Sequence, residues 1–421
     1  MITAIAITLI LLALLGTPLF IAIAGGALLA SHSADISPDI LIIEMNRLAA
    51  SPNMIAIPLF TFAGVMMSHG GAPRRLVELY RAALGWMPGG LAIVAIGSCA
   101  FFTSFSGASG VTILALGGLL YPVLKGEGYK EKFTLGLITT SGSLGLLFAP
   151  SLAILIYGIV AGVSIENMFF AGIVPGTLLM IMLALYSMYH GNKRHVERHE
   201  FELNTLLSAA RGAIWDLFLP FGIVIGIFGG FVSIMEAAAV TAAYIIIVEV
   251  YIYKEINLGR QLYDILIETC ILFGSLLIIL LVALGATNLM IDAQLPMKLR
   301  AIIEQHISSP IEFLLLLNLF LLLVGAIMDI FSAIIVVVPL ILPLAMRYGI
   351  DPVHLGIIFL ANLEIGYSTP PVGINLFIAS QRFEKTIVTL FKSTLPYLLI
   401  MLIWLMMVTY IPELSLWWKT E

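Results

Sequence analysis

Charged residues are scarce in this sequence of 421 residues. Asp, Glu, Lys and Arg make up 11% of it, whereas 61% is hydrophobic. Ordinary soluble domains carry about 25% charged residues, and no soluble fold could bury this much apolar surface. The hydrophobic runs are also longer than the alternating segments of about 10 residues that build a membrane β-barrel. The composition therefore predicts an all-α polytopic protein embedded in a lipid bilayer.

Cysteine pairs, basic tracts and catalytic motifs are missing as well. Cys99 and Cys270 both lie in apolar stretches, which favours packing roles over a disulfide. Without a basic tract, nucleic acid is not an expected partner. Without a Walker A sequence or a nucleophile–base set, we expect neither ATP hydrolysis nor an enzyme, and no organic cofactor. His195 and His199 lie in a charged stretch, where a solvated helix face is favoured over a metal site.

Long apolar stretches divide the chain into four parts. We expect an N-terminal scaffold helix and loop in residues 1–51, a first repeat in 52–190, a connecting loop with scaffold helices in 191–268, and a second repeat in 269–421. The N-terminal stretch shows no charged region or cleavage site, so it predicts a retained membrane helix, broken near Gly16. Polar loops are expected over 31–51 and 191–216. Amphipathic pieces at Arg74–Arg81 and Met297–Glu304 are expected at the membrane interface.

The two repeats correspond at a spacing of 221 positions. At this spacing Gly145 matches Gly366, and Pro150 matches Pro371. Both matches fall where Gly and Pro interrupt an apolar stretch, and a duplicated, interrupted hydrophobic segment points to the binding site of a secondary transporter. Because unpaired backbone groups are costly in hydrocarbon, we expect both breaks to line polar cavities.

Each repeat is expected to contain a re-entrant helical hairpin followed by a broken transmembrane helix. The hairpins are predicted over 86–124 and 311–346, and the broken helices over 133–163 and 353–380. Lys and Arg concentrate in alternate loops, which the positive-inside rule places on the cytoplasmic side. The number of times the chain crosses the membrane from the start of the first repeat to the start of the second is then odd. The second repeat is therefore expected to be inverted relative to the first.

The first hairpin tip and the facing broken segment are rich in hydroxyl groups and glycine. They hold Ser104, Ser106, Gly107, Ser109, Gly142 and Gly145. Hydroxyl and freed carbonyl oxygens at the ends of half-helices can coordinate Na+ or face an anion. Serine and glycine also permit close helix packing, and this alternative stays open.

The second break contains two successive prolines, which free carbonyl groups one turn earlier. Thr369 and Asn375 add side-chain oxygens on either side of Pro371, although a kink without a ligand remains an alternative. Asp329 lies at the second hairpin tip in an otherwise uncharged run. It can serve an ion site, cap the returning helix, or do both. Glu364, just before the break, is either a structural partner or a ligand.

These motifs resemble the large membrane subunit of TRAP transporters, the tripartite ATP-independent periplasmic family. The resemblance covers essentially the whole chain. It is carried by the run from Ser368 to Phe377, by Gly145–Ser151 before Tyr157-Gly158, by Met235–Val240 and by Leu15–Pro18. The chain departs from the family pattern at Ala149, where a second proline is usual, and at Ile234-Met235, where Thr-Pro is common. Glu236 in the third motif is expected to cap a helix.

The resemblance implies Na+-coupled import by an elevator motion, in which hairpins and broken helices move against a scaffold. It implies a small membrane subunit of four helices, a periplasmic substrate-binding protein, and an organic anion such as a C4-dicarboxylate or sugar acid. The location implied is the bacterial inner membrane.

Carried over residue by residue, the resemblance also implies three groups of site residues. The first sodium region contains Ser104, Ser106, Gly107, Gly142 and Gly145; the second contains Gly325, Asp329, Gly366 and Thr369; substrate is expected beside Ser109, Pro150, Ser368, Pro371, Gly373 and Asn375. We therefore predict a sodium-coupled transporter subunit. Two alternatives stay open: an ion-coupled anion carrier that acts without a binding protein, and a channel.

Overall fold

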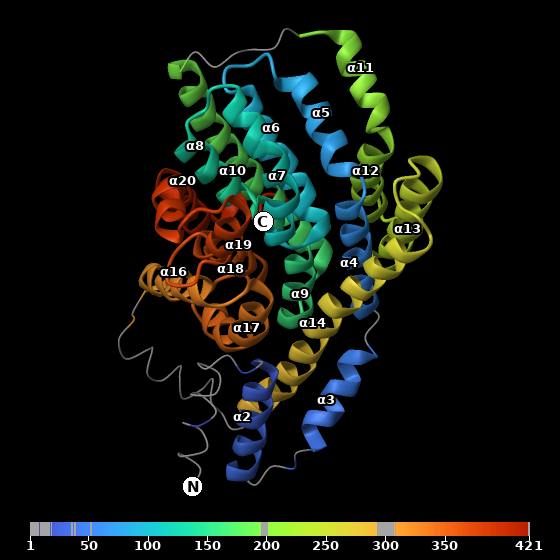
Figure 1. The fold of residues 1–421 in the computed structure, drawn as a ribbon. Coiled ribbons are helices and arrows are strands. Elements are labelled where there is room, and N and C mark those ends of the chain that lie inside the picture. The colour runs from blue at the N-terminus through green and yellow to red at the C-terminus, as the bar shows by residue number, and fades with distance from the viewer. Residues whose placement is uncertain are drawn as a thin grey trace.

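A computed structural model describes residues 19–34, 39–50, 53–194, 201–292 and 309–419, with isolated positions 8, 17, 37 and 307. Within these ranges the chain is helical apart from short connections, and it contains no strand (Figure 1). The predictions that concern Gly16, His195, His199 and residues 297–304 lie outside the described residues.

A group of helices along one side of the molecule comes from the N-terminal part and the middle of the chain. They are α2 (Leu19–Ala34), α3 (Asp39–Ala49), α4 (Asn53–His69), α12 (Ile214–Phe228), α13 (Ile234–Ile246), the π-helical η2 (Ile247–Ile252) and the long α14 (Arg260–Asp292). Helices α2, α3 and α4 all pack against α14, and α13 packs against α4 (Figure 1).

Two predicted loops are wrong in part, because each contains a helix. Helix α3 lies within residues 31–51, and α11 (Leu203–Gly212) lies within residues 191–216. In α11, Leu203, Leu206 and Leu207 recur at helical spacing among polar residues, which is the pattern of an amphipathic helix. The flanking charges hide this short pattern when the whole stretch is averaged.

The first predicted repeat, residues 52–190, begins with α4 and α5 (Ala72–Leu84) and continues with a hairpin, a broken helix and a long closing helix. The elements of these last three parts are α6 (Gly90–Ser106), α7 (Ser109–Gly126), α8 (Glu131–Ser141), the short 3-10 helix η1 (Leu144–Leu147), α9 (Leu152–Ala161) and α10 (Ile165–Arg194). The turn between α6 and α7 falls inside the predicted tip. It is made by Gly107, whose φ of 65° is left-handed and therefore suits glycine.

The hairpin, the broken helix and the closing helix recur in the same order in the second predicted repeat, without a counterpart of η1. They are α16 (Pro310–Ile327), α17 (Ile330–Arg347), α18 (Pro352–Gly366), α19 (Ile374–Phe383) and α20 (Ile387–Tyr410), followed by η3 (Pro412–Leu414). Helix α17 begins and ends 221 positions after α7. The repeat seen in the sequence is thus also a repeat of helix boundaries.

In each repeat, the second helix of the hairpin packs against the second half of the broken helix of the other repeat. Helix α7 of the first hairpin packs on α19 of the second broken helix, and α17 of the second hairpin packs on α9 of the first. The α7–α19 contact is close because Gly117 and Gly118 lie beneath Phe383 and Arg382. Such reciprocal packing is what a two-fold relation between the repeats would produce.

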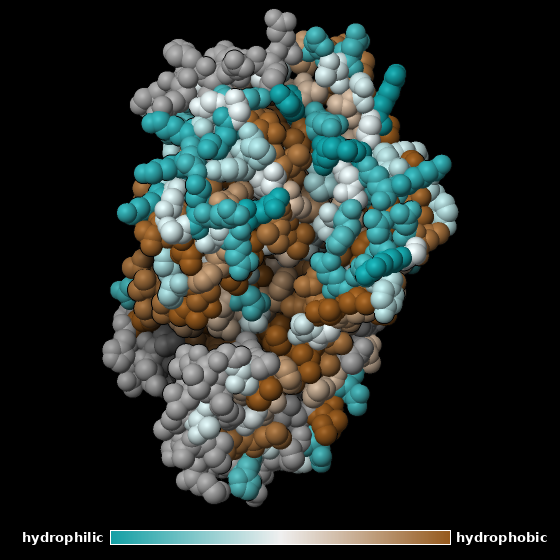
Figure 2. Space-filling model, in the orientation of Figure 1, coloured by the Kyte–Doolittle hydropathy of each residue, from teal (hydrophilic) through white to brown (hydrophobic). Residues whose placement is uncertain are grey.

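The helices have the length and apolarity of membrane spans. Among the described residues, seven helices could cross a membrane alone, or up to ten if each bent pair counts as one span. Figure 2 shows hydrophilic residues gathered at the end that carries α5 and α11, with hydrophobic residues predominating around α14 and α17. The prediction of an all-α polytopic membrane protein is therefore confirmed at the level of helix content and apolarity.

The C-terminal residues fold back onto the start of α18. Lys419 Nζ lies 2.6 Å from the carboxylate of Asp351, which caps α18 by accepting from the backbone N–H of Val353 at 2.7 Å. Burial disfavours the ionised carboxylate, but Lys419 and the capping N–H groups favour it, and the net effect lowers the pKa of Asp351. His354 Nδ1 is also within hydrogen-bonding distance of Ser415 Oγ.

Candidate ion and substrate site

The first hairpin tip is joined to the first broken helix by hydroxyl groups. Thr103 Oγ1 donates to the carbonyl of Gly142 at 2.7 Å and also lies 2.6 Å from Thr112 Oγ1. A Cβ atom on Gly145 would collide with the carbonyl of Ala100 and the amide nitrogen of Ser104. The structure therefore brings Ser104, Gly142 and Gly145 of the first predicted sodium region together.

The serines of this tip use their protons within the hairpin itself. Ser104 Oγ donates to the carbonyl of Phe101 at 2.7 Å, and Ser106 Oγ lies 3.4 Å from the carbonyl of Ala108. Because a hydroxyl oxygen keeps two acceptor lone pairs, donation leaves both oxygens able to coordinate a cation. Both side chains are buried, as an ion site inside the protein requires.

The second hairpin meets the second broken helix through a matching glycine contact. A Cβ atom on Gly366 would collide with the backbone of Gly325, so the two glycines touch, as Gly145 and Ser104 do 221 positions earlier. The carbonyl of Ala326 accepts from the N–H groups of Val372 and Gly373 at 3.0 and 3.1 Å. Thr369 Oγ1 donates to the carbonyl of Ile365 at 2.9 Å. The structure therefore brings Gly325, Gly366 and Thr369 of the second predicted sodium region together.

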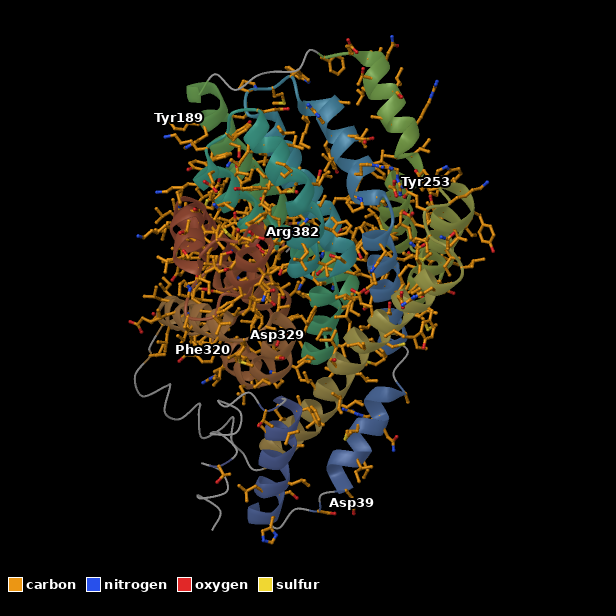
Figure 3. The ribbon with its side chains drawn as sticks, viewed as in Figure 1. Asp39, Tyr189, Tyr253, Phe320, Asp329 and Arg382 are labelled. Atoms are coloured by element: carbon orange, nitrogen blue, oxygen red, sulfur yellow. The ribbon has the colours of Figure 1, made fainter. Side chains whose placement is uncertain are left out.

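Asp329 caps the returning helix α17, which confirms one of its two predicted roles. Its Oδ2 accepts from the backbone N–H groups of Phe331 and Ser332 at 3.1 and 3.0 Å. Since Oδ2 takes both bonds, Oδ1 remains available for another group. Figure 3 shows Asp329 among the helices of the second repeat. The prediction that Glu236 is a cap is also confirmed, by a capping box with Ser233.

The predicted substrate residues divide into a buried set and an exposed set. Ser109, Pro150, Ser368, Gly373 and Asn375 are buried, whereas Pro371 is exposed. Asn375 crosses between the repeats, because its Nδ2 donates to the carbonyl of Thr139 on α8 at 3.3 Å. The carbonyl of Ser109 lies near Gly142 in the same region.

The two breaks differ in exposure although their backbones are alike. Each contains a cis peptide bond before the matched proline, Ala149-Pro150 in the first and Pro370-Pro371 in the second. Pro150 is buried, whereas Pro370, Pro371 and Val372 are exposed. The second break is therefore the open one in this conformation.

Several buried oxygens around the breaks have no hydrogen-bond partner within the described residues. They are Thr139 Oγ1, Ser141 Oγ, Ser151 Oγ, Ser368 Oγ, Asn375 Oδ1 and both carboxylate oxygens of Glu364. Buried polar groups are normally satisfied, so these oxygens are free to bind a ligand or water. The sequence singled out Ser368, Asn375 and Glu364 individually, but it could not show that their oxygens are unpaired.

A buried ion cluster on α5 was missed. Arg75 contacts three carboxylates, those of Asp216 at 2.6 Å, Glu249 at 2.8 Å and Glu255 at 2.5 Å, and lies over the ring of Tyr253. Arg75 therefore faces α12 and η2, while the placement of Arg74–Arg81 at the membrane interface stays a prediction. Acidic residues inside apolar runs, such as Glu249, were the signal that could have revealed the cluster.

A groove of about 830 Å³ lies beside this cluster, between α5 and α11. It is lined by Arg75, Glu78, Arg81, Glu202 and Thr205, among others. None of its lining residues belongs to the two hairpin clusters. We therefore separate it from the candidate ion and substrate site.

The fold resembles that of a solved transporter. The chain matches the crystal structure of the YdaH transporter from Alcanivorax borkumensis with a TM-score of 0.61, covering 88% of this chain and 86% of that one. The sequences are only 15% identical, so this likeness concerns the fold alone.

Some proteins are more similar to this chain in sequence than the YdaH transporter is. The chain is 35% identical over 377 residues to the C4-dicarboxylate TRAP transporter large permease protein DctM of Pseudomonas aeruginosa, covering 89% of this chain and 88% of that protein. It is 36% identical to the isethionate TRAP transporter permease protein DctMQ of Oleidesulfovibrio alaskensis over 86% of this chain. That match spans 57% of the relative's length.

The family itself follows from these matches. The model of the DctM component of the tripartite ATP-independent periplasmic transporter family matches residues 5–414, nearly the whole chain. The chain therefore belongs to the DctM family, the large membrane subunits of TRAP transporters.

Proposed function

We propose that this chain is the Na+-coupled membrane subunit of an importer for organic anions. The observation that carries the proposal is the pair of similar clusters at the hairpin tips. In each cluster a glycine of the broken helix touches the hairpin backbone: Gly145 does so in the first repeat and Gly366 in the second. The residues of the two contacts correspond at the spacing of 221 positions. Interrupted helices at matching places are typical of ion and substrate sites in secondary transporters.

Sodium is the coupling ion that best suits these clusters. Their donors are oxygen atoms, which suit hard cations, and no group of three or more His, Cys, Asp or Glu side chains gathers among the described residues. We assign one Na+ to the region of Ser104, Ser106, Gly107, Gly142 and Gly145, and another to the region of Gly325, Asp329, Gly366 and Thr369. Na+ is here a transported ion, carried with the substrate.

The proposed substrate site lies between the two clusters. Helices α7, α9 and α19 begin at the hairpin tip or at the breaks, and the positive ends of helices favour negative charge. We place an anionic substrate beside Ser109, Pro150, Ser368, Pro371, Gly373 and Asn375. Relatives are named for C4-dicarboxylates, isethionate and sialic acid. These are all organic anions, so we propose a carboxylate or sulfonate as the substrate.

The reciprocal packing of the two repeats supports an elevator motion of inverted repeats. The α7–α19 and α9–α17 contacts tie both hairpins to both broken helices, so these elements can move as one body. We propose that this body slides against a scaffold formed by α2–α4 and α12–α14. The exposed second break and the buried first break would then mark one end of the motion.

The remaining components are proposed from the family. We propose a small membrane subunit of four helices bound to the scaffold and a periplasmic protein that delivers substrate. The chain would act in the bacterial inner membrane. The family name itself describes a tripartite, periplasmic system.

Transport in proteoliposomes tests this function. The chain would be reconstituted with the small subunit, and uptake of labelled C4-dicarboxylate, isethionate or sialic acid measured with the purified binding protein outside. We expect uptake only with an inward Na+ gradient and the binding protein. Uptake by the chain alone would favour the stand-alone carrier, and a current that does not saturate with substrate would favour the channel.

A further inference from the structure

Glu364 is the most isolated carboxylate in the described part of the chain. It lies on α18, two residues before Gly366, and its side chain is completely buried. Neither carboxylate oxygen has a partner, in a hydrogen bond or an ion pair, within the described residues. An ionised carboxylate buried without a partner is very costly, so Glu364 needs either a proton or a counter-charge.

Two further unpaired oxygens belong to residues that follow Glu364 around the second break. Ser368 follows it by one helical turn, and the backbone remains helical to Tyr367, whose N–H donates to the carbonyl of Leu363 at 2.9 Å. The helical turn continues past the end of α18, because the N–H of Ser368 donates to the carbonyl of Ile365 at 3.1 Å, which places Ser368 one turn after Glu364. Ser368 Oγ is completely buried and lacks a partner within the described residues.

Asn375 brings the third oxygen. Its backbone N–H donates to the carbonyl of Tyr367 at 3.0 Å, which holds the start of α19 against the end of α18. Its Nδ2 donates to the carbonyl of Thr139, and its Oδ1 is buried and has no partner among the residues described. A buried carboxylate, hydroxyl and amide oxygen, each without a partner among the described residues, thus belong to the last turn of α18 and to the segment bonded to it.

We propose that Glu364, Ser368 and Asn375 form a third Na+ site, separate from the two regions at the hairpin tips. A proton would neutralise the carboxylate, whereas a cation would neutralise it and also accept lone pairs of Ser368 Oγ and Asn375 Oδ1. A hard monovalent cation satisfies all three at once, and oxygen donors suit it. The inference deepens the proposed function, on whose Na+ coupling it rests, and it assigns Ser368 and Asn375 to an ion rather than directly to the substrate.

The site belongs to the second half of the chain alone. The positions that correspond to Glu364, Ser368 and Asn375 at the 221-residue spacing are Ser143, Leu147 and Ile154. Ser143 Oγ already donates to the carbonyl of Thr140 at 3.2 Å, and the other two side chains are apolar. At these positions only the second repeat therefore contains a carboxylate and its negative charge.

Equilibrium binding of ²²Na+ to the purified complex with the small subunit tests the site without any substrate. Glu364→Gln keeps the shape of the side chain and removes its charge, so we expect it to bind about one Na+ fewer per chain, or at least about tenfold more weakly at one site. The matched control is Glu413→Gln, because Glu413 is an exposed glutamate of the same half, and it should bind as the wild type does. Equal ²²Na+ binding by Glu364→Gln and wild type would overturn the third site.

Two more comparisons separate this inference from the proposed function. If the wild type binds no ²²Na+, Na+ coupling itself is wrong, whereas loss of binding in Thr369→Ala but not in Glu364→Gln removes only the third site. If Glu364→Gln does not assemble, Ser368→Ala decides: weaker ²²Na+ binding supports the site, and unchanged binding rejects it.

Discussion

The side chain of Gly366 is a single hydrogen atom, and this allows the second broken helix to lie close to the second hairpin. The Cα of Gly366 approaches the backbone of Gly325 so closely that a methyl group has no room. Backbone atoms cannot turn aside as the end of a flexible side chain can, so the helices themselves would have to separate. The same argument holds for Gly145 against Ala100 and Ser104.

We therefore expect Gly366→Ala to destabilise the protein by about 1–3 kcal/mol, the usual effect of overpacking, and to reduce uptake. Thermal unfolding in detergent measures the first effect. Gly274→Ala is the control, because a methyl group on Gly274 of α14 would meet no atom within 4 Å and alanine favours the helix. Equal melting temperatures for the two variants would contradict the close contact.

Asp329 combines a structural bond with a candidate ion site, and one substitution separates the two. Asn caps helices about as well as Asp, so Asp329→Asn should keep the stability of α17 within about 0.5 kcal/mol. It removes the negative charge, and we expect about tenfold more Na+ to be needed for half-maximal uptake, equivalent to about 1.4 kcal/mol. An unchanged Na+ dependence would remove Asp329 from the ion site.

At the scale of elements, the α4–α5 corner depends on the Arg75 cluster. The two helices meet at a bend of 72°, and Arg75 near the start of α5 binds Asp216 on α12 and Glu249 on η2. Its side chain is 8% exposed and those of both carboxylates are fully buried. The cluster therefore fixes α5 to helices that lie far from it in sequence.

Removal of Arg75 should destabilise this corner strongly. Breaking a buried ion pair on one side leaves uncompensated charge and costs about 3–5 kcal/mol, so we expect Arg75→Ala to lower the melting temperature clearly. Arg74→Ala is the matched control. Arg74 has a 65% exposed side chain and lies 3.3 Å from the carboxylate of Glu255, and exposed pairs contribute about 0–1 kcal/mol. Similar effects of both variants would show that the cluster is not important for stability.

At the scale of the whole molecule, the two breaks are unequally exposed. Val372 beside the second break is exposed, whereas Ser151 beside the first is completely buried. The elevator proposal gives this difference a meaning, because the moving body would expose one break at a time.

Cysteine labelling tests the unequal exposure. Cys99 is buried and Cys270 is exposed, so Cys270→Ser provides the background. In it, Val372→Cys should react rapidly with a water-soluble maleimide, while Ser151→Cys should be protected because water does not reach it. In sealed vesicles, reaction from one face only would show the side to which this conformation opens. Equal reaction of both variants would contradict the difference between the breaks.

The sequence predicted the hairpins and breaks well because their signals are local. Glycine, serine and proline at positions such as Gly107 and Pro371 mark interruptions in otherwise apolar runs, and the helices end there. The short helices α3 and α11 were missed because their patterns are brief and lie among polar residues. These misses do not affect the helices that carry the candidate site.

Side-chain partners far apart in sequence could not be predicted. Arg75 and Asp216 are 141 positions apart, and nothing in either segment specifies the other. The unpaired state of Glu364, Ser368 and Asn375 depends equally on the packing of α18, α19 and α8. The sequence placed Glu364 just before the second break, but only the three-dimensional arrangement showed that no side chain of the described ranges pairs with it.

The equal glycine contacts of the two breaks have a consequence for how such a chain diverges after duplication. Gly145 and Gly366 preserve the same close approach, while Ser143 and Glu364, or Ile154 and Asn375, no longer share any chemistry. The backbone geometry is thus the inherited part, and the polar side chains are the specialised part. A chain assembled from two copies of its first half would retain both glycine contacts yet contain neither Asp329 nor Glu364, and so would inherit the framework without the charges.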